Sequence, residues 1–258
     1  MNDKQPILSM RGIYKSFGAV QALKDVDFDV YPKEICALVG DNGAGKSTLI
    51  KIAAGILRAD AGEIFFEGQK VDIAHPDDAK RLGIETLYQD LALVDNLDVT
   101  ANIFLGRERV RRLFGGLINV LQMRQMEQET WEILHSLDIR IDSVKKRAEF
   151  LSGGQRQAVA LGRAVGWGTK LVILDEPTAS LGVKEAAKAL ELISRMKERG
   201  ISMVIISHNL QHVFSVADRI VVLRRGEMVG ERIKEATNGD EIVGMITGAE
   251  LLKMEFGS

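Results

Sequence analysis

A glycine-rich loop in the first fifth of the chain carries the clearest chemistry. Residues 40–48 (GDNGAGKST) match the pattern GxxxxGK[ST] and follow an apolar, β-rich run. Glycines let such a backbone form a nest of N–H groups around phosphate oxygens, and a helix beginning near Lys46 adds its positive end. In this pattern the ammonium of Lys46 reaches the β- and γ-phosphates of a nucleotide, and the hydroxyl of Ser47 ligates Mg²⁺. The alternative is a strand-to-helix turn without a ligand, but strand and helix signals on both sides favour the phosphate site. The predicted phosphate-binding residues are Gly40, Asn42, Gly43, Ala44, Gly45, Lys46, Ser47 and Thr48.

Two neighbouring acids follow a second apolar run. Asp175 and Glu176 come directly after Leu171–Leu174. Asp175 is placed to hold Mg²⁺ through water, and Glu176 to face the γ-phosphate as the base for an attacking water. Two acids at a strand end are, taken alone, more simply a solvated edge or a helix cap. Together with the upstream loop they predict nucleotide hydrolysis.

The run LSGGQ at residues 151–155 lies between these two elements. Ser152, Gly153 and Gly154 open a predicted helix that continues to Val165, so small residues again surround a helix N-terminus. Such an end is a second anion site. One triphosphate does not need two cradles from one protomer.

Composition limits the classes of function. The 258 residues suit one domain, or a core with an inserted lobe, and 46% hydrophobic residues suffice for a core. Because 34 basic and 36 acidic residues nearly balance, we expect no nucleic-acid partner. A lone cysteine, Cys36, indicates a buried thiol and a reducing, cytosolic compartment. Without a signal-peptide pattern or a run of ~20 apolar residues, work at a membrane would be done from the side.

Patterning predicts a mixed α/β fold. The unbroken apolar runs at 171–174 and 203–206 indicate central parallel strands covered on both faces. Alternation around Phe28 and Ile64 indicates a separate antiparallel layer. The predicted strands are 8–12, 26–30, 34–39, 63–67, 84–88, 171–174, 203–206, 219–223 and 227–230. The predicted helices follow Lys46, Gln122, Gly153, Gly182, Asn209 and Asn238.

An inserted helical lobe is expected between the two halves of the core. From about Asp90 to Gly166 the strand signal disappears, and apolar residues from Met123 to Leu137 fall at helical spacing. The predicted domains are a nucleotide-binding core at 1–89 and 167–258, and a lobe at 90–166 that carries LSGGQ. A basic cluster in the lobe is expected to be a solvated loop, with a lipid-headgroup contact as the alternative. The cluster consists of Arg107, Arg109, Arg111 and Arg112.

The chain resembles the ATP-binding subunits of ABC transporters. The phosphate loop, LSGGQ and the Asp175–Glu176 strand, with Gln89 and His208 each after a strand, occur in that family's order from about Leu8 to Gly230. The resemblance implies one ABC ATP-binding domain of 258 residues, with the P-loop NTPase fold, that binds ATP and Mg²⁺ and hydrolyses ATP.

The resemblance also implies residue roles. Phe17 would stack on adenine. Gln89 would be a lobe hinge that senses the nucleotide through Mg²⁺ and the lytic water, and His208 would bond the γ-phosphate and position Glu176. The implied catalytic residues are Glu176, His208, Gln89 and Lys46, and the implied metal ligands are Ser47, Gln89 and Asp175. The signature residues Ser152, Gly153, Gly154 and Gln155 would close over ATP held by the loop of a second subunit.

Simpler interpretations stay open for three of these residues. Phe17 could be a core aromatic, Gln89 an ordinary polar strand end, and His208 a helix cap. The other histidines match no motif and are expected at the surface. They are His75, His135 and His212.

The family usually has an aspartate where this chain has Gly182, which puts the coupling of two sites in doubt; a backbone group or a neighbouring side chain would have to substitute.

Two segments resemble a narrower branch of the family. Residues 95–108 and 206–214 are similar to ATP-binding subunits of bacterial monosaccharide importers of the ribose and fructose type. The resemblance implies an ATPase that powers solute import from the cytoplasmic face of the plasma (inner) membrane, as a peripheral subunit. Its implied partners are a second copy, membrane-spanning permease subunits and, indirectly, an extracytoplasmic solute-binding protein. The alternatives are an amino-acid importer subunit or a soluble, non-transport ABC ATPase. The sugar itself is not encoded in this subunit.

Overall fold

The structure is a computed structural model that describes residues 5–88, 91–113, 118–166, 168–179 and 181–249. The chain divides into two compact units. The first comprises residues 1–89, 169–179 and 197–258, and the second comprises residues 90–168 and 180–196. The second unit therefore includes residues 180–196, which the sequence analysis assigned to the core. The predicted domain boundaries stay a prediction.

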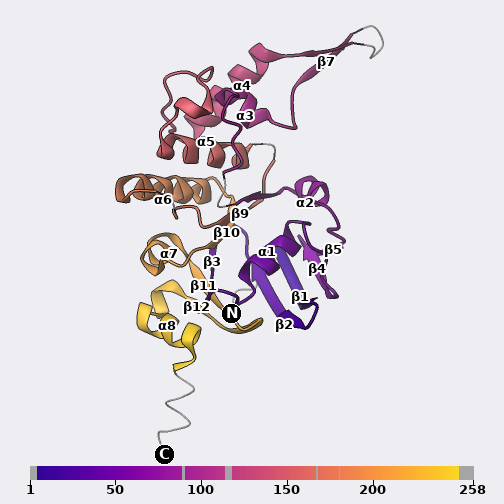
Figure 1. Cartoon of the computed structure of the whole chain (residues 1–258), viewed down its shortest axis with the longest axis vertical. Coiled ribbons are helices and arrows are strands. Elements are labelled where there is room, and N and C mark those ends of the chain that lie inside the picture. The colour runs from indigo at the N-terminus through magenta and orange to yellow at the C-terminus, as the bar shows by residue number, and fades with distance from the viewer. Residues whose placement is uncertain (1–4, 89–90, 114–117, 167, 180, 250–258) are drawn as a thin grey trace, which may run out of the picture. The chain divides into compact units, whose positions relative to one another are not determined.

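An antiparallel sheet forms one layer of the first unit. Its strand order is β2-β1-β4-β5 (Figure 1). The strands are β1 (Leu8–Phe17), β2 (Val20–Val30), β4 (Ala61–Phe66) and β5 (Gln69–Val71). Leu8 pairs with Val30 on one side and Phe66 on the other, and all three are buried. The predicted antiparallel layer is confirmed; β5, which is short and exposed, was not predicted.

A six-stranded sheet forms the second layer of this unit, in the order β12-β11-β3-β10-β9-β6. The strands are β3 (Ile35–Val39), β6 (Ile84–Leu87), β9 (Leu171–Asp175), β10 (Ser202–Ile206), β11 (Arg219–Arg224) and β12 (Glu227–Ile233). All pairs are parallel except β11 with β12. Every residue of β3 and β10 is buried, as unbroken apolar runs predict. Burial raises the pKa of Cys36 in β3 to about 12, so the thiol is a packing group.

Register brings three strand ends to the same edge of this sheet. Ile206 of β10 pairs with Asp175 of β9 on one side and with Leu38 of β3 on the other. The loops that leave these strands carry the phosphate loop, Glu176 and His208. Ligands of parallel α/β sheets bind outside the carboxyl ends of the strands, so the topology places the predicted groups where such a site belongs.

Helices complete the first unit. They are α1 (Lys46–Ala53), α2 (Pro76–Leu82), α7 (Leu210–Val216) and α8 (Gly239–Thr247). Asn209 and Asn238 cap α7 and α8 by accepting hydrogen bonds from the amides of His212 and Glu241. Three of these helices were predicted; α2 was not.

Packed helices make up most of the second unit. They are α3 (Val99–Phe104), α4 (Met123–Ser136), α5 (Gly153–Val165) and the greater part of α6 (Val183–Glu198). α3 packs against α4 and α5. Met126 and Leu134 are buried at helical spacing, as predicted, whereas Met123 is exposed. No helix within the described ranges combines the length and the apolar character needed to cross a bilayer.

A β-hairpin in the second unit corrects the sequence analysis. β7 (Val110–Leu113) pairs with β8 (Ile118–Leu121) inside the stretch where no strand was expected. The prediction failed because each strand has only four residues, too few for a clear period of two to stand out. Arg111 and Arg112 lie in β7, so the expectation of a basic loop is wrong for these two residues.

Candidate functional site

Close backbone approaches shape the phosphate loop between β3 and α1. Gly40, Gly43 and Gly45 have φ angles of 153°, 79° and 106°. A Cβ on Gly40 would lie 2.1 Å from the carbonyl oxygen of Leu223, and one on Gly45 would lie 2.6 Å from that of Ala22. Both glycines are thus required sterically as well as conformationally. The loop therefore has the glycine-dependent backbone that the phosphate-binding pattern requires.

Lys46 lies over this loop. Its Nζ donates to the carbonyl oxygens of Gly40 at 2.7 Å and Asp41 at 2.9 Å. Burial lowers the pKa of Lys46, while the nearby charges of Glu176, Asp41 and Asp175 oppose that shift. A half-buried ammonium bonded only to carbonyls gains from an anionic oxygen, because charge-assisted hydrogen bonds are the stronger ones. The position of the Lys46 ammonium therefore fits a phosphate group.

Gly40→Ala is expected to damage the loop more than Gly43→Ala. Both glycines have positive φ, but a Cβ on Gly43 would meet nothing within 4 Å, whereas one on Gly40 would meet backbone. The extra cost at Gly40 is about 1–3 kcal/mol of unfolding free energy. Urea unfolding of the two variants measures it. Equal losses would contradict a steric role for Gly40.

Asp175 and Glu176 stand at the end of β9. The amide of Glu176 donates to the carbonyl of Ile206 at 2.9 Å, and Glu176 has a φ of 53°, unusual for a residue with a side chain. Burial raises the pKa of Asp175, and the adjacent charge of Glu176 raises it further. A cation would relieve this crowding of negative charge. Backbone strain at a charged residue is a common feature of functional sites.

Glu176 and His208 are brought together, as predicted. Oε1 of Glu176 accepts from the backbone N–H of His208 at 3.1 Å and lies 2.8 Å from His208 Nδ1. The Glu176 side chain is 16% exposed and that of His208 is 74% exposed. His208 is not the helix cap, since Asn209 holds that position. The simpler interpretation of His208 is therefore wrong.

A second link, between the segment after β9 and helix α7, was not predicted from the sequence. Oγ1 of buried Thr178 lies 2.9 Å from Nδ1 of His212, and Asn209 Oδ1 accepts from the amide of His212 at 3.2 Å. His212 was expected at the surface without a role, yet it is half-buried. No motif marks this pair, because the bond joins residues 34 apart.

His212→Ala is expected to lower the free energy of unfolding by about 1 kcal/mol, because the buried hydroxyl of Thr178 loses its partner. Thr178→Val removes the other half of the pair. Urea unfolding of both single variants and the double variant forms a cycle, and we expect the double variant to lose less than the sum. Strict additivity would show that the hydrogen bond contributes nothing.

Phe17 ends β1 with its ring 48% exposed. Lys15 Nζ lies 5.7 Å from the ring centroid. The ring is not in the core, so the interpretation of Phe17 as a core aromatic is wrong. An exposed ring is available for stacking; that it stacks on adenine stays a prediction.

The signature residues form a capped helix start in the second unit. Ser152 Oγ accepts from the amide of Gln155 at 3.2 Å, and Gln155 Oε1 accepts from the amide of Ser152 at 3.1 Å. This capping box satisfies two amides and leaves those of Gly153 and Gly154 without an intrahelical acceptor. The Gln155 side chain is occupied by the cap, and the two free amides are the groups that the predicted anion site requires.

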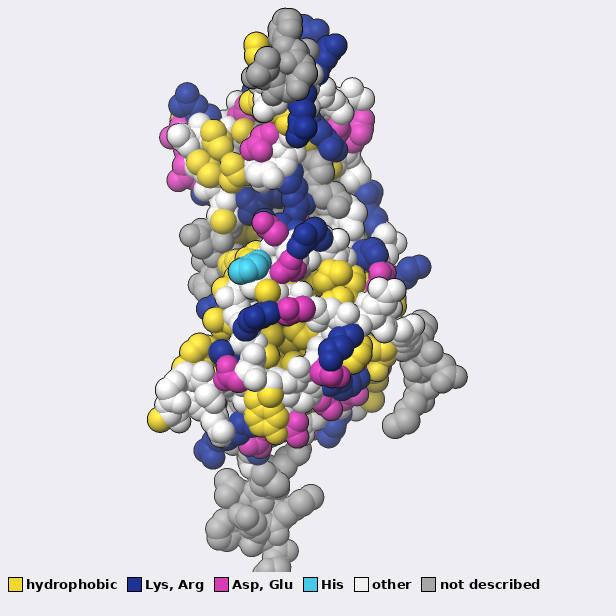
Figure 2. All heavy atoms as spheres, turned by 90° about the vertical axis from the view of Figure 1, so that its right-hand side faces the viewer, with side chains coloured by type: hydrophobic (Ala, Val, Ile, Leu, Met, Phe, Trp, Pro, Cys, Tyr) yellow, Lys and Arg dark blue, Asp and Glu magenta, His cyan; other side chains and the backbone are white. Residues whose placement is uncertain are grey.

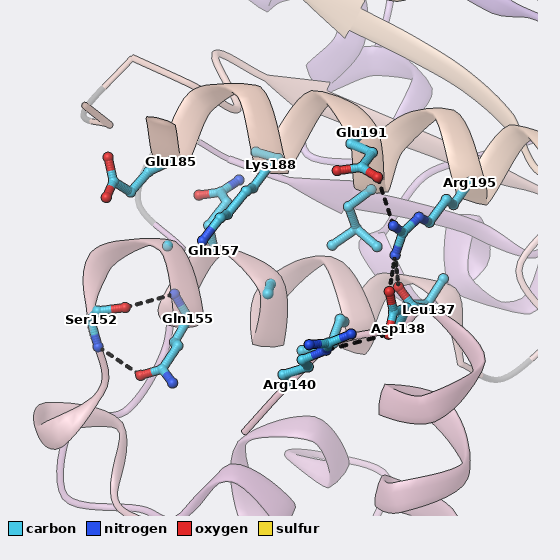
Figure 3. A pocket seen from close by; sticks show the side chains of 15 residues that line it. Leu137, Asp138, Arg140, Ser152, Gln155, Gln157, Glu185, Lys188, Glu191 and Arg195 are labelled. Atoms are coloured by element: carbon cyan, nitrogen blue, oxygen red, sulfur yellow. Dashed lines mark hydrogen bonds and ion pairs between the residues drawn. The ribbon is translucent and has the colours of Figure 1, made fainter. Parts of the chain in front are cut away.

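A cavity of about 360 Å³ runs from this helix start between α5 and α6 (Figure 3). Gln157, 4% exposed, lines it, and its Nε2 has no hydrogen-bond partner within the described chain. Lys188 reaches into the cavity from α6, whereas Arg195 is held by Asp138 and Glu191 (Figure 3). The charges around this cavity balance, because its lining includes Arg140, Lys188 and Arg195 and also Asp138, Glu185 and Glu191.

Glu185 fills the space beside the unusual glycine. A Cβ on Gly182 would lie 2.7 Å from Glu185 Oε2. A neighbouring carboxylate thus stands where a side chain at position 182 would begin. Glu185 is the candidate for the neighbouring side chain that takes over from the family's usual aspartate. This role stays a prediction.

The remaining predicted site residues fall into three groups. Ser47 is exposed at the first turn of α1, next to the loop, and Asn42 and Thr48 lie in the loop and in α1. Gln89 lies outside the described residues. Ser152 to Gln155 belong to the second unit, whereas the phosphate loop belongs to the first.

Comparison with known proteins decides the family. The family described as ABC transporter matches residues 23–179, more than half of the chain. The chain belongs to this family. The xylose/arabinose import ATP-binding protein of Sulfolobus acidocaldarius is 47% identical over 97% of this chain and 98% of its own length. The fructose import ATP-binding protein of Rhizobium meliloti is 45% identical, with 96% of both chains covered. A ribose import ATP-binding protein of Rubrobacter xylanophilus is 42% identical, but this chain spans 48% of it.

Solved structures of ABC cassettes agree with the fold. The ADP conformation of an ATP-binding cassette of an ABC transporter matches with a TM-score of 0.78 and 26% identity, over 98% of this chain and 100% of the other. A dimeric bacterial ABC transporter cassette matches with a TM-score of 0.73 at 22% identity, over 89% and 100% of the two chains, which supports the fold alone. The predicted family, P-loop NTPase fold and ABC-type ATPase activity are confirmed. The roles of individual residues stay predictions.

Proposed function

We propose that this ABC ATPase powers the import of a monosaccharide through a membrane permease. The observation that carries the hydrolytic part is the double hydrogen bond from His208 to Glu176 at the sheet edge that also carries the Lys46 loop. The names of the relatives, which import xylose or arabinose, fructose and ribose, support the sugar class. The length of the chain also suits an amino-acid importer subunit, but two relatives of similar length are named as sugar import proteins, which favours the sugar class.

Each group has a proposed task in hydrolysis. The loop amides and Lys46 would hold the phosphates of ATP, and Phe17 would stack on its base. Glu176 would accept a proton from the attacking water; His208 occupies Oε1, so Oε2 is free for that water. His208, largely exposed, would donate to the γ-phosphate when its ring turns from Glu176.

Mg²⁺ fits the oxygen donors at this edge. The hydroxyl of Ser47 and the carboxylate of Asp175 are hard ligands, and Mg²⁺ commonly uses one or two such groups together with phosphate oxygens and water. The raised pKa of Asp175 also marks a place where a cation is favourable. When bound, the ion would neutralise charge that develops on the phosphate oxygens. Gln89 is proposed as a further ligand from the family pattern alone.

A second copy would complete the site. The capped start of α5 is an anion site that the phosphate loop of the same chain does not need. In a two-fold dimer, each signature would cover ATP on the loop of the other copy, so both sites are satisfied by one symmetric contact. The ribose relatives are about twice as long as this chain, whereas the two single-length relatives match it end to end. A second copy of this chain is the proposed partner cassette.

The proposed assembly is a cassette dimer beneath membrane-spanning permease subunits, with an extracytoplasmic solute-binding protein delivering the sugar. The chain would be peripheral, at the cytoplasmic face of the inner membrane.

To test this assembly, the tagged chain is purified from its native membranes with its permease and reconstituted in vesicles. We expect ATP hydrolysis to rise when the binding protein carries one sugar from a panel of xylose, arabinose, fructose and ribose. Stimulation of ATP hydrolysis by amino acids only would contradict the proposal. Purification of the tagged chain without any membrane protein would contradict it too.

A further inference from the structure

The hairpin β7–β8 exposes apolar side chains on both of its faces. Val110, Ile118, Val120 and Leu121 are each between 44% and 50% exposed. Directly opposite residues share a face in an antiparallel pair, so Val110 with Leu121 lies on one face and Val120 on the other. A two-stranded ribbon with no sheet to cover it is only marginally stable in water. Burial of these side chains against another surface would therefore stabilise the ribbon.

The base of the hairpin is fixed to α4. Arg109 Nη2 lies 2.9 Å from Glu129 Oε2, and the amide of Gln122 donates to the carbonyl of Arg109 at 2.8 Å. Gln125 Nε2 also donates to Glu129 at 2.8 Å. The charge of Arg109 is thus neutralised within the unit. The ribbon beyond it is held at its base, with its two strands exposed.

Two arginines on the ribbon carry uncompensated charge. Arg111 and Arg112 are exposed in β7 and form no ion pair within the described part of the chain, and the described residues of β7 and β8 include no acid. Arg111 is directly opposite Val120, and Arg112 shares its face with the Val110–Leu121 pair, so each face has one arginine near an apolar residue. Figure 2 shows basic side chains gathered around this end of the second unit.

We propose that the β7–β8 ribbon binds the surface of a membrane rich in anionic lipids. Apolar side chains beside free guanidinium groups suit the boundary between acyl chains and headgroups, where the first are buried and the second bond to phosphate oxygens. An acidic protein groove would match the charge, but a ribbon with apolar groups on both faces suits a fluid interface that surrounds it. The proposal rests on the proposed location at a membrane and extends it, because this contact needs no permease.

Sedimentation with vesicles tests the proposal without any permease. The purified full chain is mixed with vesicles of phosphatidylcholine alone or of phosphatidylcholine with phosphatidylglycerol. We expect binding to the anionic vesicles that weakens as salt is raised, and little binding to the neutral ones. Replacing both arginines, R111A/R112A, should weaken it roughly 30-fold, because each basic residue near such a surface contributes about 5-fold.

Matched variants separate charge from apolar contact. K184A/R199A removes two exposed positive charges, one in α6 and one in the turn that follows it, and should leave vesicle binding unchanged. I118T/V120T keeps β-branched residues in the ribbon but lowers the apolar area, and should weaken binding at high salt as well. ATP hydrolysis by all variants reports that the chain is folded.

Three results would overturn the proposal. They are equal binding to neutral and anionic vesicles, equal loss in K184A/R199A and R111A/R112A, or loss of permease co-purification in R111A/R112A with vesicle binding intact. The last result would assign the ribbon to a protein partner. Failure of sugar to stimulate hydrolysis would overturn the proposed transport function and leave the vesicle result standing.

Discussion

Glu176→Gln is expected to lower the turnover number for ATP roughly 10²- to 10⁴-fold while ATP binding is retained. The Gln side chain keeps an oxygen that accepts the two hydrogen bonds from His208, so the local geometry is preserved. It cannot take a proton from water at neutral pH. Only the proton-accepting role is removed.

Phosphate release measures turnover, and fluorescent-nucleotide titration measures binding. Glu198→Gln is the matched control, because it makes the same change on an exposed residue at the end of α6 and should retain wild-type turnover. Undiminished hydrolysis by Glu176→Gln would remove Glu176 from the mechanism. Loss of binding along with turnover would indicate a structural role.

Asp175→Asn is expected to abolish Mg²⁺-dependent hydrolysis while it stabilises the nucleotide-free chain. A carboxyl group with a raised pKa in the folded chain ionises more readily in the unfolded chain, so its charge costs stability at neutral pH. Burial is the main cause and Glu176 adds to it. Asparagine fills the same space without the charge, and we expect a gain of roughly 0.5–2 kcal/mol, typical of stabilising changes at functional sites.

The stabilisation by Asp175→Asn is expected to depend on pH. The gain should be present at pH 7 to 8 and should shrink as the pH falls through the raised pKa of Asp175, because the wild-type carboxyl then becomes neutral too. Urea unfolding across this range measures it. Asp142→Asn, which alters a carboxylate that is 88% exposed, should show no such gain. A less stable Asp175→Asn protein would show that the charge of Asp175 does not destabilise the folded chain.

The chemistry of the first unit could be predicted because it depends on local sequence. The phosphate loop needs glycines at Gly40 and Gly45, where the structure leaves no room for a Cβ. Central strands such as β10 are continuous apolar runs because both faces are covered. Since parallel strands end at one edge, the order of motifs along the chain was enough to place Lys46 near Asp175.

Elements stabilised by specific contacts could not be predicted. The short helix α2 forms through a capping box between His75 and Asp78, a local signal too weak to stand out in composition. The Thr178–His212 bond joins positions that no pattern links. The strands of β7–β8 lack the alternation that a covered face imposes, because in this chain neither face is covered.

The Glu176→Gln protein shows most directly whether ATP is hydrolysed between two copies of this chain. Light scattering during size-exclusion chromatography measures its molar mass with and without ATP and Mg²⁺. We expect the mass of one chain without nucleotide and of two chains with it, and a return to one chain when Ser152→Glu adds negative charge to the signature. A mass of one chain at saturating ATP and Mg²⁺ would contradict hydrolysis between two copies.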